Sequence, residues 1–397
     1  MIASRTILTV TSATALVVGL VGCAAQPSAS SAADPARTLT IGVSSIQSGS
    51  AATSGLGMKC AVEAYLDAAN EAGGVNGYTF EVVSRDHQYD PARAATIARE
   101  FVGDGVFAMV TDGTATMKAA LPAVERAKIP IFATADGALF TPPEYPAMFG
   151  INPDYAREAA SGAKFILDDL GETSAGLAYL NSEAGKPASE SFPKYMTDNG
   201  GSVAATVAIA ATATDFTPYA QSLKASGTAV VYSFLLDTQL ASLQKASDAI
   251  GFAPKWVSWF PAFTKSYLDL AGPLAEGTYM SAFSTPLSDT TDPGVAEYLK
   301  VMTPHCPDNM TSQSAMSAAS FADAIVNAVG AASADGQEVT QTSFVSAMAG
   351  SNLELGVTPS VTWSEETHAG ATQSAMYQIA DSALVSVTPY EEQPNIK

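Results

Sequence analysis

Short apolar runs that alternate with helix-like segments constrain the fold of this chain most strongly. In the first third, runs rich in β-branched and aromatic residues predict buried strands, and the segments between them carry apolar residues at helical spacing. The predicted strands are 39–43, 80–83, 106–110 and 129–133, and the predicted helices are 58–72, 91–102 and one that ends at residue 124. This alternation predicts a parallel sheet covered by helices on both faces.

The same pattern begins again after residues 149–154. Further strands are predicted at 175–180, 203–209, 229–233 and 255–259, and further helices at 189–198 and 238–250. A chain of 397 residues is also too long for one small core. The sequence therefore predicts an α/β protein with two parallel-sheet halves.

The N-terminus predicts where the protein acts. Arg5 precedes an apolar run from Ile7 to Leu20, and this run is shorter than the roughly 20 residues that span a bilayer. The ending Leu20-Val21-Gly22-Cys23 resembles a bacterial lipobox. The resemblance implies a lipoprotein signal peptide over 1–22, and a lipid with acyl chains such as palmitate on Cys23. It also implies an extracytoplasmic protein anchored to the bacterial cell membrane. The alternative is a plain signal peptide followed by a chance cysteine.

Composition limits the partners of the remaining 375 residues. Residues 23–37 consist largely of Ala, Ser and Pro and predict a flexible tether. The formal net charge is −20 for the full chain and 18 − 39 = −21 without Arg5, which argues against nucleic acid and against electrostatic binding to anionic lipid. With Cys23 assigned to lipid, Cys60 and Cys306 remain, and in an oxidising compartment this pair predicts a disulfide. Two separate buried thiols are the alternative.

Several motifs together resemble one protein family. Gly73-Gly74-Val75-Asn76-Gly77 looks like its GGI-x-G turn, Asp90-Pro91 opens a stretch like its DP-xx-A motif, and 215–219 (DFTPY) resembles DFSPY. In this order the motifs resemble the leucine/isoleucine/valine-binding proteins of ABC importers. The resemblance implies two similar doubly wound lobes, a three-stranded hinge and a ligand cleft between the lobes. By analogy the crossings fall near residues 150, 282 and 356. Lobe I is then 38–152 plus 282–355, and lobe II is 153–281 plus 356–397.

Loops after the strands of the first half supply the first candidate ligand residues. Ligands of open parallel sheets bind beyond the carboxyl ends of the strands, where free helix N–H groups attract anions. Ser48 and Ser54 follow the first strand, Thr114 the third, and Ala135 and Asp136 the fourth. The resemblance implies that Thr114 and the 135–136 pair hold a carboxylate and an amine, although an acid at 136 departs from the family. The alternative is that these polar residues cap helices.

The second half departs further from the resemblance. The loop at 181–186 lacks the family's aromatic residue, and the segment around Trp259 and Phe260 lacks its acid. Asp237 or Asp136 is expected to replace that acid, unless the ligand is not an α-amino acid. The two aromatic residues are expected to face the cleft, with a place in the core as the alternative. Two acids without a clearly placed Lys or Arg favour a cationic, zwitterionic or amide-like solute over a dianion.

No catalytic constellation is apparent in the sequence. His87, His305 and His368 are scattered without metal-ligand spacing, and no nucleophile elbow or phosphate loop is present. We expect a non-enzymatic, monomeric lipoprotein with no metal or cofactor. It would capture a small polar solute by hinge closure and deliver it to the membrane subunits of an ABC permease. A ligand-sensing lipoprotein that regulates a receptor is the alternative, and a lipoprotein hydrolase is a third hypothesis.

Overall fold

A computed structural model describes residues 37–49, 52–349, 352–364 and 366–396. The expected signal peptide, Cys23 and the tether up to residue 36 lie outside the described residues. Arg37, expected as the last tether residue, is the first residue of strand β1.

The first sheet is parallel throughout and has five strands in the order β2-β1-β3-β4-β5. Their bounds are Arg37–Ser45 (β1), Tyr78–Asp86 (β2), Ala108–Asp112 (β3), Ile131–Thr134 (β4) and Met148–Gly150 (β5). In the register, Ile41 lies between Val82 and Ala108. All five residues of β3 and all four of β4 are buried, as expected for central strands covered on both faces.

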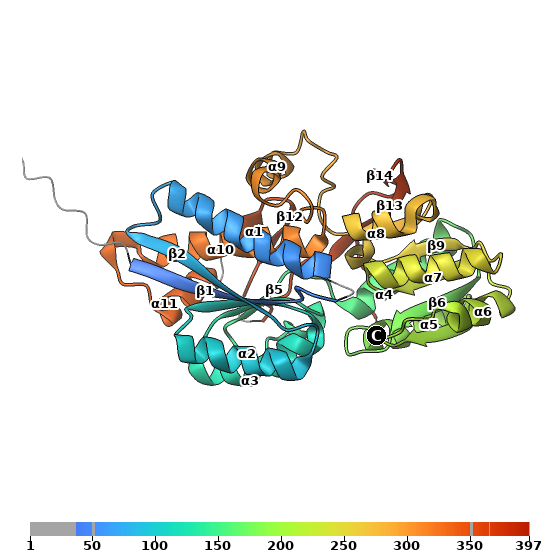
Figure 1. Ribbon diagram of the computed structural model, residues 1–397, viewed down its shortest axis with the longest axis horizontal. Helices are drawn as coiled ribbons and strands as arrows, with labels where there is room; N and C mark the ends of the chain where they lie inside the picture. The colour runs from blue at the N-terminus through green and yellow to red at the C-terminus, as the bar shows by residue number, and fades with distance from the viewer. Residues whose placement is uncertain (1–36, 50–51, 350–351, 365, 397) are drawn as a thin grey trace, which may run out of the picture. The chain divides into compact units, whose positions relative to one another are not determined.

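Helices cover both faces of this sheet. Figure 1 shows α1 and α10 on one face and α2 and α3 on the other. The helices of this part are α1 (Ala52–Glu71), α2 (Pro91–Asp104), α3 (Thr114–Ala127), α9 (Pro293–His305), α10 (Gln313–Ala332) and α11 (Gln341–Met348), with short 3-10 turns η1 (Gly137–Leu139) and η4 (Ala334–Gly336). Among the described residues, only α10 is long and apolar enough to cross a membrane, but 67% of its most apolar window is buried, as in a core helix.

The second sheet has eight strands, of which seven follow the order β14-β13-β10-β9-β8-β6-β7 and β15 pairs with β13. Their bounds are Ser174–Leu180 (β6), Ser202–Ile209 (β7), Val230–Phe234 (β8), Lys255–Ser258 (β9), Tyr279–Ala282 (β10), Gln373–Ala380 (β13), Ala383–Ser386 (β14) and Glu391–Glu392 (β15). Strands β6 to β10 are parallel, and β13 runs antiparallel to β10. The chain thus contains the two parallel-sheet halves that its sequence predicts.

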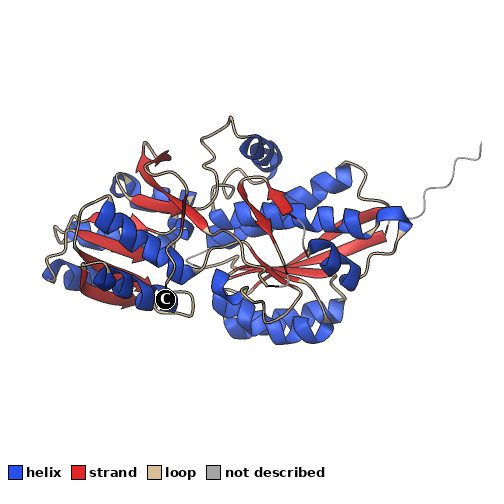
Figure 2. Ribbon diagram, turned by 180° about the vertical axis from the view of Figure 1, so that it is seen from behind, coloured by secondary structure: helices blue, strands red, loops and turns tan. Residues whose placement is uncertain are grey.

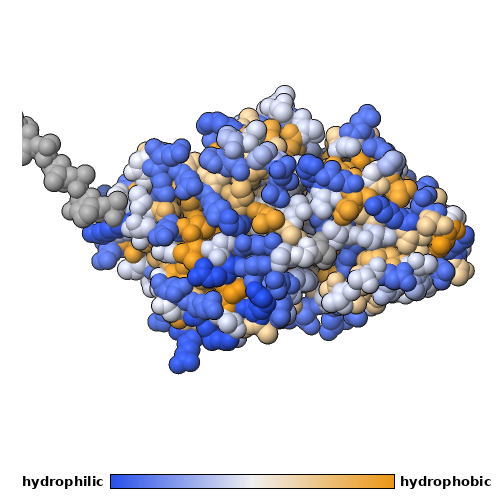
Figure 3. All heavy atoms as spheres, in the orientation of Figure 1, coloured by the Kyte–Doolittle hydropathy of each residue, from blue (hydrophilic) through white to orange (hydrophobic). Residues whose placement is uncertain are grey.

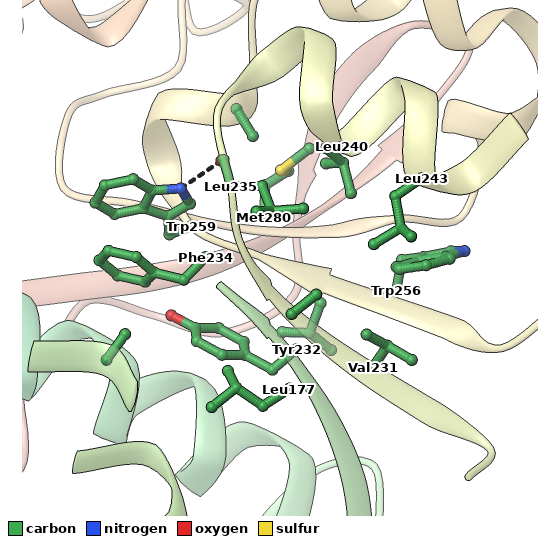
Figure 4. Close-up of a cluster of buried hydrophobic side chains, with 14 of the residues drawn as sticks. Leu177, Val231, Tyr232, Phe234, Leu235, Leu240, Leu243, Trp256, Trp259 and Met280 are labelled. Atoms are coloured by element: carbon green, nitrogen blue, oxygen red, sulfur yellow. Dashed lines mark hydrogen bonds between the residues drawn. The ribbon is translucent and has the colours of Figure 1, made fainter. Parts of the chain in front are cut away.

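Helices also flank the second sheet, as the view from behind shows (Figure 2). They are α4 (Tyr155–Asp168), α5 (Lys186–Asp198), α6 (Thr217–Ala225), α7 (Asp237–Ala249) and α8 (Lys265–Ala271), with 3-10 turns η2 (Phe260–Ala262) and η3 (Gly272–Ala275). The core of this part gathers aromatic and aliphatic side chains from several strands (Figure 4). Phe234 stacks on Trp259 with ring centroids 3.5 Å apart, so these rings fix the loop after β9.

Local sequence explains where two of the helices begin. Asp90 caps α2 by accepting the amide N–H of Ala92 at 2.7 Å, and Pro91 occupies the first turn, as predicted. Helix α1 begins at Ala52, six residues before the expected start at residue 58. Gly55 explains this difference, because a Cβ at this position would collide with the carbonyl of Ile46. The glycine that suggested a loop permits a close contact inside a helix.

A disulfide joins Cys60 on α1 to Cys306 at the end of α9. The bond closes a sequence separation of 246 residues. The expected pairing is thus present in the structure, and it fastens α9 to the helices that cover the first sheet. Hydrophilic side chains cover much of the face shown in Figure 3, in keeping with the strongly acidic composition.

Within the part of the chain that the structure describes, three segments connect the two sheets: 151–154, 283–292 and 363–372 without residue 365. The third one differs from the expected crossing near residue 356. Gly356, with a φ of +65°, turns the chain between β11 (Asn352–Leu355) and β12 (Thr358–Thr362). Val357, Val361 and Trp363 then pack into the core of the first sheet. Residues 356–363, expected in lobe II, therefore belong with the first sheet.

The first and third connections are bonded to each other. The amide of Gly150 donates to the carbonyl of His368, and the amide of Ala371 donates to the carbonyl of Ile151, both at 3.0 Å. A Cβ at Gly370 would collide with the Ile151 backbone, so the chain requires glycine there.

Candidate functional site

A cavity of about 50 Å³ lies where the carboxyl ends of strands from both sheets face each other. We call it the cleft cavity. Its walls come from the ends of β1, β3, β4, β6 and β9 and from the first turns of α3, α4 and α10. Its residues are Ile46, Ser54, Tyr89, Asp112, Gly113, Thr114, Thr134, Asn152, Tyr155, Leu180, Ala184, Leu236, Trp259, Phe260, Pro261, Gln313 and Ser314. This is the position at which open parallel sheets bind ligands.

Four of the eight predicted ligand residues line the cleft cavity: Ser54, Thr114, Trp259 and Phe260. They come from three different segments, because Trp259 and Phe260 are neighbours, and the fold brings together residues 206 positions apart in sequence. Ser54 is hydrogen-bonded to Ser314 of α10, with the two hydroxyl oxygens 2.7 Å apart. Thr114 is the first residue of α3, and its hydroxyl accepts the amide N–H of Asp136 at 3.2 Å.

Ser48 and Ala135 do not line the cleft cavity. The Ser48 hydroxyl donates to the carboxylate of Asp86 at 2.6 Å and accepts from Gln88, so it stabilises the loop after β2. Ala135 is fully buried, and its side chain lies in a core cluster of the first sheet.

Asp136 and Asp237 also do not line the cleft cavity, and each carboxylate is hydrogen-bonded to other groups of the protein. Asp136 accepts amide N–H groups from Tyr155 at 2.9 Å and from Ala138 at 3.2 Å. Asp237 accepts from the amide of Thr238 and from the hydroxyl of Thr264. Burial raises the pKa of each carboxyl to about 6, against the lowering effect of these hydrogen bonds. The capping alternative therefore describes Asp136, which caps η1, whereas Asp237 is the first residue of α7 and does not cap it.

The acid that does line the cleft cavity is Asp112, at the end of β3. It is 3% exposed, and its Oδ1 lies 2.8 Å from Nε2 of the fully buried His87. The amide of Tyr89 donates to Nδ1 of His87 at 3.0 Å. An N–H that donates to Nδ1 leaves the hydrogen of a neutral ring on Nε2, which faces Asp112. The two side chains are in close polar contact at the edge of the cavity without hydrogen-bond geometry between Nε2 and Oδ1, and the amide of Ile46 donates to Oδ2 of Asp112 at 3.5 Å.

The first turn of α3 offers hydrogen-bond donors beside this carboxylate. Gly113 precedes the helix with a φ of +82°, and no side chain caps this end. The first N–H groups of a helix have no partner within the helix and carry a partial positive charge. Because Gly113 and Thr114 line the cleft cavity, these donors are placed to receive a carboxylate.

Aromatic rings form the wall on the side of the second sheet. Tyr155 packs edge-on against Trp259, with ring centroids 5.1 Å apart. The indole N–H of Trp259 donates to the carbonyl of Leu235 at 2.6 Å, and the dashed line in Figure 4 marks this bond. The Tyr155 hydroxyl accepts from the side chain of Asn152 at 3.1 Å. This wall is rigid because its rings are packed on one side and hydrogen-bonded on the other.

Tyr89 faces this wall from the first sheet. Burial and the nearby charge of Asp112 raise the pKa of the Tyr89 hydroxyl to about 12, so it remains protonated and able to donate. Tyr89 was not predicted as a site residue, and it lies in a loop with a φ of +57°. Tyr155 was also missed, although its place directly after the helix cap Asp154 at the first connection is a usable signal.

Two contacts join the sides of the cleft. Tyr155 of α4 donates its amide N–H to Asp136, which follows β4. Lys118 of α3 lies 3.1 Å from Glu183 in the loop after β6, and both side chains are about half exposed. An exposed ion pair of this kind contributes at most about 1 kcal/mol, so it favours this arrangement only weakly.

Together these residues place a carboxylate, free helix N–H groups and aromatic rings around one cavity. The lining of the cleft cavity includes one carboxylate and no Lys or Arg. Helix N–H groups can receive an anionic group, Asp112 can receive a cationic one, and the rings can contact apolar atoms. Two parallel sheets with a ligand cavity at their carboxyl edges constitute the type 1 periplasmic binding fold.

Comparison with known proteins identifies the family. Residues 38–383 match the model of the periplasmic binding protein family, and the chain belongs to that family. A curated relative, Leu/Ile/Val-binding protein homolog 2 from Brucella abortus, is 24% identical over 244 residues. That match covers 60% of this chain and 65% of the relative's length, which is just under two thirds.

Solved structures show the same fold. A branched-chain amino acid ABC transporter protein from Thermus thermophilus with bound valine has a TM-score of 0.82 at 19% identity, and the match covers 90% of this chain and 97% of that one. A fatty acid ABC transporter substrate-binding protein from Thermomonospora curvata has a TM-score of 0.79 at 20% identity, with coverage of 90% and 92%.

Proposed function

We propose that this protein is the extracytoplasmic solute-binding component of an ABC importer and that it captures a small zwitterion, an amino acid or a related amide. One observation supports this proposal above the others. The Asp112 carboxylate and the uncapped first turn of α3 lie together in a cavity that has an aromatic wall. A zwitterion satisfies both polar groups, whereas a dianion would leave Asp112 facing a like charge.

Each end of the solute has an assigned partner in this proposal. The solute carboxylate accepts N–H groups from the start of α3, with the Thr114 hydroxyl beside it. The ammonium group contacts Asp112, which lies 2.8 Å from the His87 ring. Trp259 and Tyr155 cover the apolar part. Hydrogen bonds to charged groups contribute about 1.5–3 kcal/mol each, so these two ends supply most of the specificity.

Closure of the two sheets around the solute completes the proposed mechanism. The cleft cavity has walls from both sheets, so separation of the sheets would open it. Bending at the three connections is the movement that we propose, as in other binding proteins that close around a ligand. The Lys118–Glu183 pair then re-forms at the mouth of the cleft.

The cleft supports binding and not catalysis in this proposal. His87 resembles a catalytic histidine because it lies beside an aspartate. Its ring is fully buried, however, and both of its nitrogens face groups of the protein. It contacts Asp112 and has no catalytic role in this proposal.

Delivery to a membrane complex is also part of the proposal. A lipid on Cys23 would keep the protein beside the permease subunits that receive the solute. Membership of the periplasmic binding protein family supports a partner of this kind. A monomer is sufficient, since one chain contains both walls of the cleft.

Binding measurements with matched variants test the site. The free L-amino acids and their amides are screened by thermal shift, and hits are measured by calorimetry. We expect Asp112→Asn to weaken the best hit by about 10- to 150-fold, the loss of one charged hydrogen bond. Asp237→Asn removes an equally buried carboxylate outside the cavity and should change affinity less than about threefold, below 1 kcal/mol. A hit that responds to Asp237→Asn and not to Asp112→Asn would refute this site.

A further inference from the structure

A second cavity of about 180 Å³ lies next to the cleft cavity. We call it the rear chamber. Its walls come from η2, from the second connection, from the first turn of α10 and from the β13–β14 turn. Its apolar lining includes Phe260, Phe263, Ala282, Leu287, Met316 and Leu384.

Two residues line both cavities, Phe260 and Gln313. Phe260 packs edge-on against Phe283, with ring centroids 4.8 Å apart. The Gln313 side chain donates to the hydroxyl of Ser284. These two side chains therefore form the partition between the cleft cavity and the rear chamber, and a rotation of Phe260 would join the two spaces.

The rear chamber suits an uncharged, apolar group. Its lining contains no Lys, Arg, Asp or Glu. Two of its hydroxyl groups already have partners within the protein, because Ser281 donates to Glu158 and Ser284 accepts from Gln313. The buried Thr311 hydroxyl has no hydrogen-bond partner among the described residues, so the chamber offers a neutral polar contact but no opposite charge for an ionised group.

The volumes indicate how a solute would divide between the two spaces. One water-sized group needs roughly 10–15 Å³ of such volume. The cleft cavity of about 50 Å³ accommodates a head group of a few heavy atoms, and the rear chamber of about 180 Å³ holds several times more. A solute confined to the cleft cavity would have little room for a side chain.

We propose that the rear chamber receives the apolar arm of the same solute whose zwitterionic head binds at Asp112 and α3. The substrate class is then an α-amino acid or amide with an apolar arm longer than that of leucine. The proposal rests on the proposed function for the head group, and it adds a second binding site behind Phe260.

A series of amino acids with the same head group and apolar side chains of increasing length tests whether the rear chamber binds the arm. Calorimetry on the purified protein compares alanine, norvaline, norleucine and 2-aminooctanoate. Each buried methylene contributes about 0.8 kcal/mol, so affinity should rise about fourfold per added methylene through 2-aminooctanoate. A series that stops gaining affinity at norvaline would overturn the rear chamber as a binding site.

A tryptophan variant that fills the rear chamber is compared with a tryptophan variant outside it. Ala383→Trp places a large ring among the lining residues, and Val385→Trp places the same ring two residues away, where Val385 is 52% exposed. We expect Ala383→Trp to weaken the affinity for 2-aminooctanoate at least tenfold and to leave the affinity for alanine unchanged. Val385→Trp should leave both unchanged. Leu287→Trp, on the second connection, repeats the test if Ala383→Trp fails to fold.

The outcomes separate the two proposals. Binding of alanine that depends on Asp112, together with a flat chain-length series, overturns the rear chamber and leaves the proposed function standing. A rising series that Ala383→Trp does not reduce also overturns it. If none of the four amino acids binds, both proposals are wrong.

Discussion

Burial of the Glu158 carboxyl makes the stability of the protein depend on pH. It lies on α4 in the second sheet's layer and is only 1% exposed. The Ser281 hydroxyl and the Gln393 side chain donate to its two carboxylate oxygens, the latter at 2.6 Å. Burial outweighs these bonds and raises the pKa of Glu158 from 4.5 to about 7. The perturbation is Glu158→Gln, which keeps the shape and removes the charge.

The size of the effect follows from that shift. A rise from 4.5 to about 7 corresponds to about 3 kcal/mol at 1.36 kcal/mol per pKa unit. The pKa of Glu158 is higher in the folded state than in the unfolded state. Between pH 4.5 and about 7, this carboxyl therefore keeps its proton in the folded protein and has lost it in the unfolded chain. The contribution of Glu158 is therefore complete below pH 4.5, and it is lost as the pH rises through 7.

Urea unfolding between pH 4 and pH 8.5 measures this contribution. Fluorescence of Trp256 and Trp259 reports on the core that contains α4. The free energy of unfolding of Glu158→Gln minus that of the wild type should increase by about 3 kcal/mol from pH 4 to pH 8.5. The exposed Glu338 supplies the control, since Glu338→Gln removes the same charge at the surface. Its difference curve should be flat.

A flat difference curve for Glu158→Gln would refute the reasoning. It would mean that the carboxylate ionises in the folded state as easily as in the unfolded chain. A curve that falls with pH would reverse the sign and show that the two hydrogen bonds outweigh burial.

Three further predictions concern other parts of the chain. Cys23→Ala should abolish incorporation of labelled fatty acid, and an unlabelled wild type would contradict the anchor. Replacing Cys60 and Cys306 by alanine should lower the free energy of unfolding by about 5 kcal/mol or less, from the long loop that the bond closes, as measured by urea unfolding against the oxidised protein. Gly113→Ala should weaken ligand binding and lower the free energy of unfolding by about 1–3 kcal/mol, because the backbone is left-handed there and the new Cβ would lie 2.7 Å from the Tyr89 ring. An unchanged affinity in calorimetry would contradict this prediction.

The strands were predictable because burial on both faces leaves a simple pattern. The predicted run 39–43 lies within β1, and 175–180 lies within the largely buried β6. Continuous apolar runs of this kind need no tertiary information. The three-residue β5 and the start of α1 were not predicted. Their conformations depend on pairing with β4 and on the contact between Gly55 and Ile46, which appear only after folding.

The site was predictable by position and less so by residue. The rule that ligands bind at the carboxyl ends of strands pointed to loops that line the cleft cavity, including the one that carries Thr114. It could not separate Asp112 from Asp136, because both acids directly follow strands or lie at their ends. What distinguishes them is the nearest free N–H group. Asp136 accepts the amide N–H of Tyr155, and Asp112 contacts the ring of a buried histidine in the loop after β2.

The paired first and third connections also matter for engineering this protein into an optical sensor. Gly150 and Ala371 tie these two segments into one ribbon, and Gly370 leaves no space for a side chain between them. A fluorescent domain inserted into either segment would split the ribbon and destroy the movement that it was meant to report. The exposed residues 289–291, on the second connection just before α9, offer an insertion point that leaves the ribbon whole.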